Sequence, residues 1–175
     1  MIGLLRFVGL INAAVWFGSA LFIAIGAESA ATSPAMKDLL GPKNFPYFSL
    51  AIDQILTTRL FHVYLLCSVV ALLHLAAEWL YLGKYPHRVW LGLVLCFCLI
   101  GVTQNYWLQP RLAAWHRLRY SGGAQSQAAD HAFGYGQTAS EMLDFIVILG
   151  LAVYLWRVAY PPEPARFLTP SKFRG

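Results

Sequence analysis

Three long runs of apolar residues in this chain carry no Asp, Glu, Lys or Arg. They occupy residues 7–27, 60–77 and 89–108. About 20 predominantly apolar residues form a helix long enough to cross the hydrocarbon core of a bilayer, which is roughly 30 Å thick. A helix also satisfies its own backbone hydrogen bonds, which no water can do in that layer. Each run therefore predicts a transmembrane helix.

A weaker fourth run lies near the C-terminus, where only residues 145–156 are free of charge. With this run the sequence predicts an all-α integral membrane four-helix bundle. We expect a membrane domain over residues 1–160, with spans at about 4–27, 54–82, 88–109 and 138–160. Residues 161–175 contain several prolines and are expected to form an extended cytoplasmic tail.

Composition supports a bilayer as the solvent of this chain. Only 12% of the 175 residues are charged and 58% are hydrophobic, whereas a soluble domain is about one quarter charged. The net charge is +5, but the basic residues lie at the ends of the apolar runs and form no stripe. Because nucleic-acid binding needs clustered positive charge, we exclude a nucleic-acid partner.

The basic residues also predict the orientation of the chain, since cytoplasmic loops carry an excess of Lys and Arg. The side that holds both termini has the larger number: Arg6, Lys84, Arg88, Arg157, Arg166, Lys172 and Arg174. Both termini are therefore expected in the cytoplasm. The opposite side is expected to have two long loops, at 29–48 and 111–132. The first of these loops would contain a short amphipathic helix around Met36, Leu39 and Leu40.

Polar residues gather at the outer ends of the predicted spans, where each is a candidate site residue because burying it in a membrane is costly. In the second span, Arg59 and His62 share a helical face with Gln54 and Thr58. We expect this face to meet polar residues of the third and fourth spans, namely Asn105, Glu141 and Asp144. Such a cluster is interpreted as a structural ion-pair network, with a ligand, ion or proton site and simple solvent exposure as the alternatives.

A second polar pair, His74 and Glu78, is expected at the cytoplasmic end of the second span. The two residues are four positions apart, so they share a helical face. Glu78 can also be met by Lys84 or Arg88 across the short turn at 83–87. We interpret the pair as structural.

The histidines argue against a bound haem. Four-helix membrane cytochromes hold haem between histidines of two helices, whereas His62 and His74 belong to one predicted span. His116 and His131 are expected in a loop. We therefore expect no cofactor. A copper or zinc site that uses His62, His116 or His131 with nearby carboxylates is a weaker alternative.

The chain resembles the transmembrane protein 205-like family, also called domain of unknown function 4149, in its bacterial form. The resemblance rests on Asn12-Ala-Ala-Val-Trp16-Phe-Gly18 in the first span, Pro110-Arg-Leu-Ala-Ala-Trp-His116 after the third, and Ser140-Glu-Met-Leu143 at the start of the fourth. The family pattern has a histidine three residues before that serine, where this chain has Gln137. The layout is also similar to copper resistance protein D.

This resemblance implies a four-helix protein of the bacterial inner membrane, with periplasmic outer loops and no established activity. Our leading hypothesis is a non-enzymatic accessory or interaction subunit, whose partners are the bilayer and other membrane subunits or further copies of the chain. The alternative is a small transport protein that handles an ion, a metal or protons. A third hypothesis is a haem-associated subunit of a membrane oxidoreductase.

Overall fold

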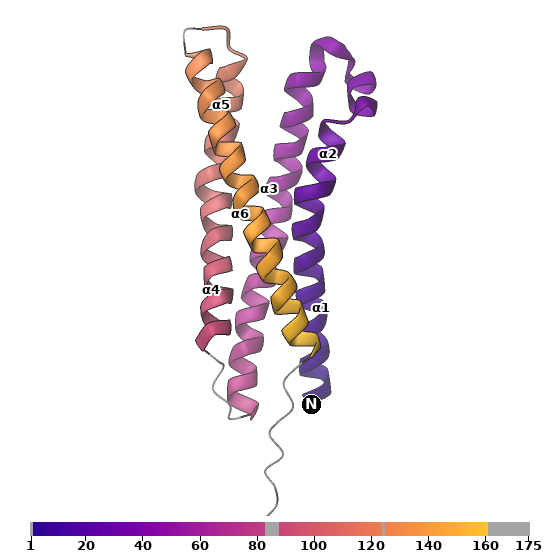
Figure 1. Cartoon of the computed structure of the whole chain (residues 1–175), viewed down its shortest axis with the longest axis vertical. Helices are drawn as coiled ribbons and strands as arrows, with labels where there is room; N and C mark the ends of the chain where they lie inside the picture. Colours follow the sequence, from indigo (N-terminus) through magenta and orange to yellow (C-terminus); the bar gives the residue numbers. More distant parts are fainter. Residues whose placement is uncertain (1, 83–87, 124, 161–175) are drawn as a thin grey trace, which may run out of the picture.

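The computed structural model describes residues 2–82, 88–123 and 125–160, and all the regular structure in these residues is helical. Four long helical segments run side by side (Figure 1). The first contains α1 (Ile2–Leu21), the π-helical turn η1 (Phe22–Ala27) and α2 (Glu28–Ala31), and the second is α3 (Pro34–Leu82). The third contains α4 (Arg88–Thr103), the π-helical turn η2 (Gln104–Leu108) and α5 (Gln109–Arg119), and the fourth is α6 (Ser126–Ala159).

Each of the four segments contains a helix that is long and apolar enough to cross a membrane. These stretches are Leu4–Ala31, Tyr47–Leu80, Arg88–Arg119 and Ser126–Ala159. Large apolar side chains such as Leu66, Leu73 and Leu99 point outward and are exposed, as expected where lipid is the solvent. The predicted all-α architecture with four spanning helices agrees with this arrangement, which is that of a multi-pass membrane protein.

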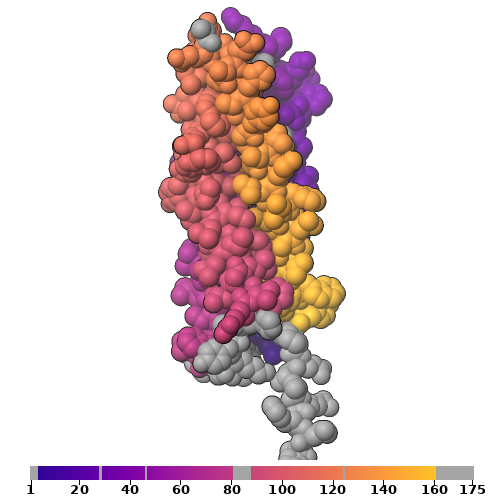
Figure 2. Space-filling model, turned by 60° about the vertical axis from the view of Figure 1, so that its left-hand side comes forward, coloured from indigo at the N-terminus to yellow at the C-terminus, as the bar shows by residue number. Residues whose placement is uncertain are grey.

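The helices pack in a fixed order around the bundle. α1 contacts α3 and α6, while α4 packs on α3 and α5 packs on α6. Figure 2 shows α5 and the first part of α6 in close contact along one face. The beginning of α1 and the end of α6 lie at the same end of the molecule (Figure 1). The expected short turn at 83–87 and the expected tail at 161–175 lie outside the described residues.

The two long loops expected from the sequence are mostly helical. Residues 34–48 belong to α3, residues 111–119 to α5 and residues 126–132 to α6. Prolines and a glycine in the first segment and polar residues in the second favour loops, but polar residues also form helices where a helix extends into water. α3 bends at Gly41, which has φ 73° and ψ 158°, a backbone conformation that favours glycine. The bend separates the short helix around Met36 and Leu39 from the rest of α3.

The bundle is longer than a bilayer is thick. α6 has 34 residues and is therefore about 50 Å long, against about 30 Å of hydrocarbon. Charged side chains gather at one end, formed by α2, α5 and the first parts of α3 and α6: Lys37, Asp38, Lys43, Arg111, Arg117, Arg119 and Asp130. We infer that this end, which we call the protruding end, extends beyond the hydrocarbon layer.

An aromatic cluster in the middle of the bundle joins all four segments. Trp16 of α1 is completely buried. Its ring makes edge-to-face contacts with Tyr64 of α3, Phe97 of α4 and Tyr154 of α6, with centroid distances of 5.2, 5.8 and 6.3 Å. Such geometry is the preferred one for aromatic pairs. Glycine at position 150 lets the backbone of α6 approach the ring of Phe97 closely, as small residues do between membrane helices.

Replacing Gly150 with Ala should destabilise the protein by about 1–3 kcal/mol, because the added methyl group would overlap the ring of Phe97. The matched control is Gly92→Ala in α4, where an added Cβ meets nothing within 4 Å. That change should leave stability unchanged or raise it by up to about 1 kcal/mol through helix propensity. Unfolding by dodecyl sulfate in mixed micelles measures both, and equal effects would contradict the packing argument.

Candidate functional site

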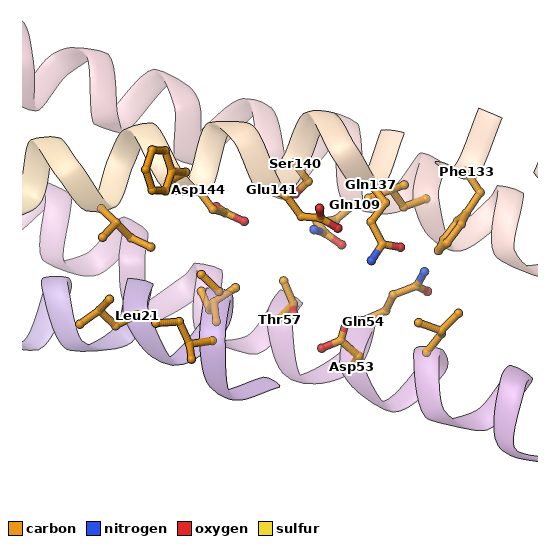
Figure 3. A pocket seen from close by; sticks show the side chains of 17 residues that line it. Leu21, Asp53, Gln54, Thr57, Gln109, Phe133, Gln137, Ser140, Glu141 and Asp144 are labelled. Atoms are coloured by element: carbon orange, nitrogen blue, oxygen red, sulfur yellow. The ribbon is translucent and has the colours of Figure 1, made fainter. Parts of the chain in front are cut away.

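A cavity of about 390 Å³ lies between η1, α3, α5 and α6, beside the protruding end. Eight of the residues that line it are polar: Asp53, Gln54, Thr57, Gln109, Gln137, Ser140, Glu141 and Asp144. Figure 3 shows the side chains of Asp53 and Gln54 on one wall and those of Gln137 and Glu141 on the wall opposite. We call this space the acidic cavity.

All the charged side chains in the described lining of the acidic cavity are negative. Its lining includes the carboxylates Asp53, Glu141 and Asp144, and no Lys, Arg or His among the described residues. One oxygen of Asp53, Oδ1, is buried without a hydrogen-bond partner in the described part of the chain. A buried polar atom that lacks a partner is costly, and more so when it carries charge. The cavity therefore favours a positively charged group beside Asp53.

A hydrogen-bond network holds Asp144 at the inner end of the acidic cavity. Gln104 of η2 is almost completely buried. Its Nε2 donates to Oδ1 of Asp144 at 2.9 Å, and its Oε1 accepts from Ser140 Oγ, also at 2.9 Å. The network fixes the orientation of the Asp144 carboxylate. The turns η1 and η2 flank this level of the bundle, and π-helical turns of this kind occur frequently at functional sites.

The expected cluster of Arg59 and His62 with Glu141 and Asp144 is not formed. The α3 residues that face α6 across the cavity include Asp53 and Thr57. Arg59 and His62 lie six and nine residues after Asp53, so they point about 120° and 180° away from it around the helix. They line a separate groove beside α5. The prediction that Gln54, Thr58, Arg59 and His62 share one helical face is correct. That face lies beside α5, however, and not against Glu141 and Asp144 of α6.

The predicted site residues and the residues that line the acidic cavity differ at several further positions. Asn105 is buried in η2 next to Gln104 but does not line the cavity. The sequence analysis did not assign Asp53, Thr57, Gln109 or Ser140 to the site. The spacing of Asp53 and Thr57, and of Ser140 and Asp144, was the available signal, because residues four apart share a helical face.

The histidines considered as metal ligands lie in different surroundings. His62 is exposed, and its Nδ1 lies 2.8 Å from the carbonyl oxygen of Thr58. His116 is 2% exposed and stacks on Tyr47 with a centroid distance of 5.1 Å, while its Nε2 lies 3.1 Å from the Tyr47 carbonyl oxygen. His131 is exposed on α6. Within the described ranges, no three His, Cys, Asp or Glu side chains gather as a metal site would require.

The polar pair at the opposite end of the bundle is in contact. His74 Nε2 lies 3.4 Å from Glu78 Oε1. Among the described residues, Glu78 forms a salt bridge with Arg157 of α6, whose Nη2 lies 3.8 Å from Glu78 Oε2 and whose guanidinium stacks over the ring of Trp90. Lys84 and Arg88 were the expected partners. Lys84 lies outside the described residues, and α6 supplies the charge because its end is close to the end of α3.

Comparisons of this chain with models of known protein families, with characterised proteins and with solved structures find no match.

Proposed function

We propose that this chain is a non-enzymatic, multi-pass membrane protein that binds a small organic cation in the acidic cavity. The observation that carries the proposal is the set of three carboxylates in a cavity whose described lining has no basic side chain. The buried, unpartnered Oδ1 of Asp53 adds to it. Buried ionisable groups that lack a partner are costly to keep and cluster at functional sites.

The attraction between a bound cation and a carboxylate of the acidic cavity is large. At the edge of a membrane protein, an opposite charge 4 Å from a carboxylate gains about 4 kcal/mol at an effective dielectric constant of 20. Burying the Oδ1 atom of Asp53 away from water is unfavourable without such a partner. A bound cation offsets part of this cost, whereas an anion in the same place would be repelled. The cavity thus selects for positive charge.

The dimensions and the walls of the cavity favour an organic ammonium group. A volume of about 390 Å³ is at the lower end of the range of small-molecule sites, about 300–1,000 Å³. Phe133 and Phe145 contribute aromatic rings to the walls, and aromatic faces attract quaternary ammonium groups. The side-chain carbonyl oxygens of Gln54 and Gln137 supply neutral acceptors for N–H donors.

The tightly packed core below the cavity supports one-sided binding over an open pore. Trp16, Val147 and Leu151 are each at most 2% exposed and belong to one continuous apolar cluster. A solute beside Asp144 would therefore be accessible from the protruding end. Its passage to the other end of the bundle would require the aromatic cluster to open. This favours a role in capturing a cationic solute, which differs from the alternative expected from the sequence, a small transport protein that handles an ion, a metal or protons.

Other parts of the sequence interpretation stay predictions. They are the location in a bacterial inner membrane, the resemblance to the transmembrane protein 205-like family, the role as an accessory subunit and the haem-associated role. Capture of a solute is compatible with an accessory role if a partner subunit carries out the next step.

Calorimetric titration of the purified chain in dodecyl maltoside micelles tests the proposal. The probes are choline, ethanolamine and 3,3-dimethylbutan-1-ol, the neutral carbon analogue of choline. We expect saturable binding of at least one of the two cations and none of the alcohol. Equal binding of choline and its neutral analogue, or no binding of either cation, would overturn the proposal.

A further inference from the structure

A second hollow, separate from the acidic cavity, lies between α3 and α5 at the protruding end. It has a volume of about 440 Å³. Its lining includes Gln54, Arg59 and His62 of α3 and His116 and Arg117 of α5. Gln54 lines both hollows and lies at the boundary between them. We call this second hollow the basic groove.

The charge of the basic groove is opposite to that of the acidic cavity. Arg59 comes from α3 and Arg117 from α5, and both arginines are exposed. His62 lies on the same face as Arg59, and no Asp or Glu is among the described residues that line the groove. Guanidinium groups present several N–H donors in a planar fork that matches phosphate oxygens. The groove therefore favours a phosphate-type anion.

Two buried atoms give the groove unused hydrogen-bonding capacity. The side chain of His116 is almost completely buried, and its Nδ1 has no partner in the described part of the chain. Gln54 Nε2, an N–H donor, is also buried without a described partner. Buried polar atoms are nearly always paired with protein, water or ligand. An anion in the groove would give the Gln54 amide an acceptor, whereas His116, whose Nε2–H donates to the Tyr47 carbonyl oxygen, presents only an acceptor at Nδ1 while neutral.

The part of the groove near Arg59 lies at the level of lipid headgroups, and the part near Arg117 lies above them. Arg59 lies next to the apolar run that begins at Leu60, and Arg117 lies nine residues after the end of the run that closes at Leu108. At 1.5 Å per residue the groove extends from the edge of the hydrocarbon to about 13 Å above it. Headgroups and the interface occupy roughly the first 5–8 Å of that distance.

We propose that the basic groove binds a phosphate group, presented either by a phospholipid headgroup or as a free phosphate. Arg59 and Arg117 hold the phosphate oxygens from the two sides of the groove. The Nε2 of Gln54, at the boundary between the groove and the acidic cavity, donates a further hydrogen bond to the phosphate. This site is distinct from the cation site, because its arginines lie on a different face of α3 and its ligand has the opposite charge, although Gln54 lines both.

Native mass spectrometry of the full chain in dodecyl maltoside tests this site. The lipid probe is dioctanoyl phosphatidylglycerol, its phosphate-free control is dioctanoylglycerol, and inorganic phosphate is titrated separately. We expect the wild type to retain phosphatidylglycerol or to bind phosphate, and not to retain dioctanoylglycerol. The double variant Arg59→Gln, Arg117→Gln should weaken binding about 100-fold, or tenfold for each charged hydrogen bond lost.

Arg111→Gln is the matched control. Arg111 belongs to the same helix and loses the same charge, but it stacks over Trp107 and does not line the groove. It should change binding by less than about twofold, as expected for a surface charge. If the double glutamine variant does not fold, Arg59→Lys, Arg117→Lys should still weaken binding severalfold relative to Arg111→Lys, because lysine lacks the planar fork.

The two probes distinguish the sources of the phosphate group. Retention of phosphatidylglycerol that depends on Arg59 and Arg117, without binding of inorganic phosphate, identifies a lipid headgroup. Binding of inorganic phosphate with the same dependence identifies a soluble phosphate. Binding of neither probe, or equal weakening by the groove variant and by Arg111→Gln, would overturn the proposal.

Discussion

Replacing Asp53 with Asn is expected to weaken the binding of choline or ethanolamine by about 10- to 100-fold. The substitution keeps the shape of the side chain and removes its negative charge. A hydrogen bond or contact to a charged group contributes about 1.5–3 kcal/mol, and each 1.4 kcal/mol is a factor of ten in affinity. The Asp53 carboxylate has a buried oxygen without a described partner, so its charge is the one most available to a cationic ligand.

The control for this variant is Asp38→Asn. Asp38 is also in α3 and carries the same charge, but it is exposed and does not line the acidic cavity. Calorimetric titration should show near wild-type affinity for Asp38→Asn. Asp53→Asn should also leave the unliganded protein at least as stable as the wild type, because it removes a buried charge. Equal affinities of the two variants would refute the role of Asp53.

Replacing Trp16 with Ala is expected to lower the free energy of unfolding by about 3–5 kcal/mol, the range found for truncating a fully buried aromatic side chain. Trp16 is 0% exposed and contacts one aromatic ring from each of the other three segments. Its loss would leave a void in the centre of the bundle, and the contacts of Tyr64, Phe97 and Tyr154 with it would be lost together.

Unfolding by dodecyl sulfate in mixed micelles measures this effect, and Trp156→Ala is its control. Trp156 is also a tryptophan in a spanning helix, but it is 68% exposed on α6. Its truncation should cost less than about 1 kcal/mol, since an exposed side chain leaves no cavity behind. Similar losses for the two variants would mean that the aromatic cluster does not hold the segments together.

The faces of individual helices could be predicted from the sequence. The spacing of Gln137, Glu141 and Asp144 puts them on one face of a helix, and all three line the acidic cavity. The contact of His74 with Glu78 follows from their spacing of four residues. These relations lie within one helix, whose periodicity is known in advance.

The partners of those faces could not be predicted in the same way. The rotation of α3 directs Asp53 towards α6 and Arg59 towards α5, so the expected single cluster is divided into an acidic cavity and a basic groove. Arg157 meets Glu78 for a similar reason, because the end of α6 reaches the end of α3. Helix rotation and crossing depend on side-chain packing around Trp16, which spacing within one helix does not reveal.

Four apolar helices suited to a bilayer follow from the amino-acid sequence alone, because three of the runs are long enough to cross the hydrocarbon layer without a charge and the fourth is apolar over residues 145–156. Which polar residues come into contact depends on how the helices pack. Charge alone predicts an ion pair between Arg59 and Glu141, because opposite charges attract. Close packing of Trp16, Tyr64, Phe97 and Tyr154 leaves each helix one rotation, and that rotation keeps the two charges apart.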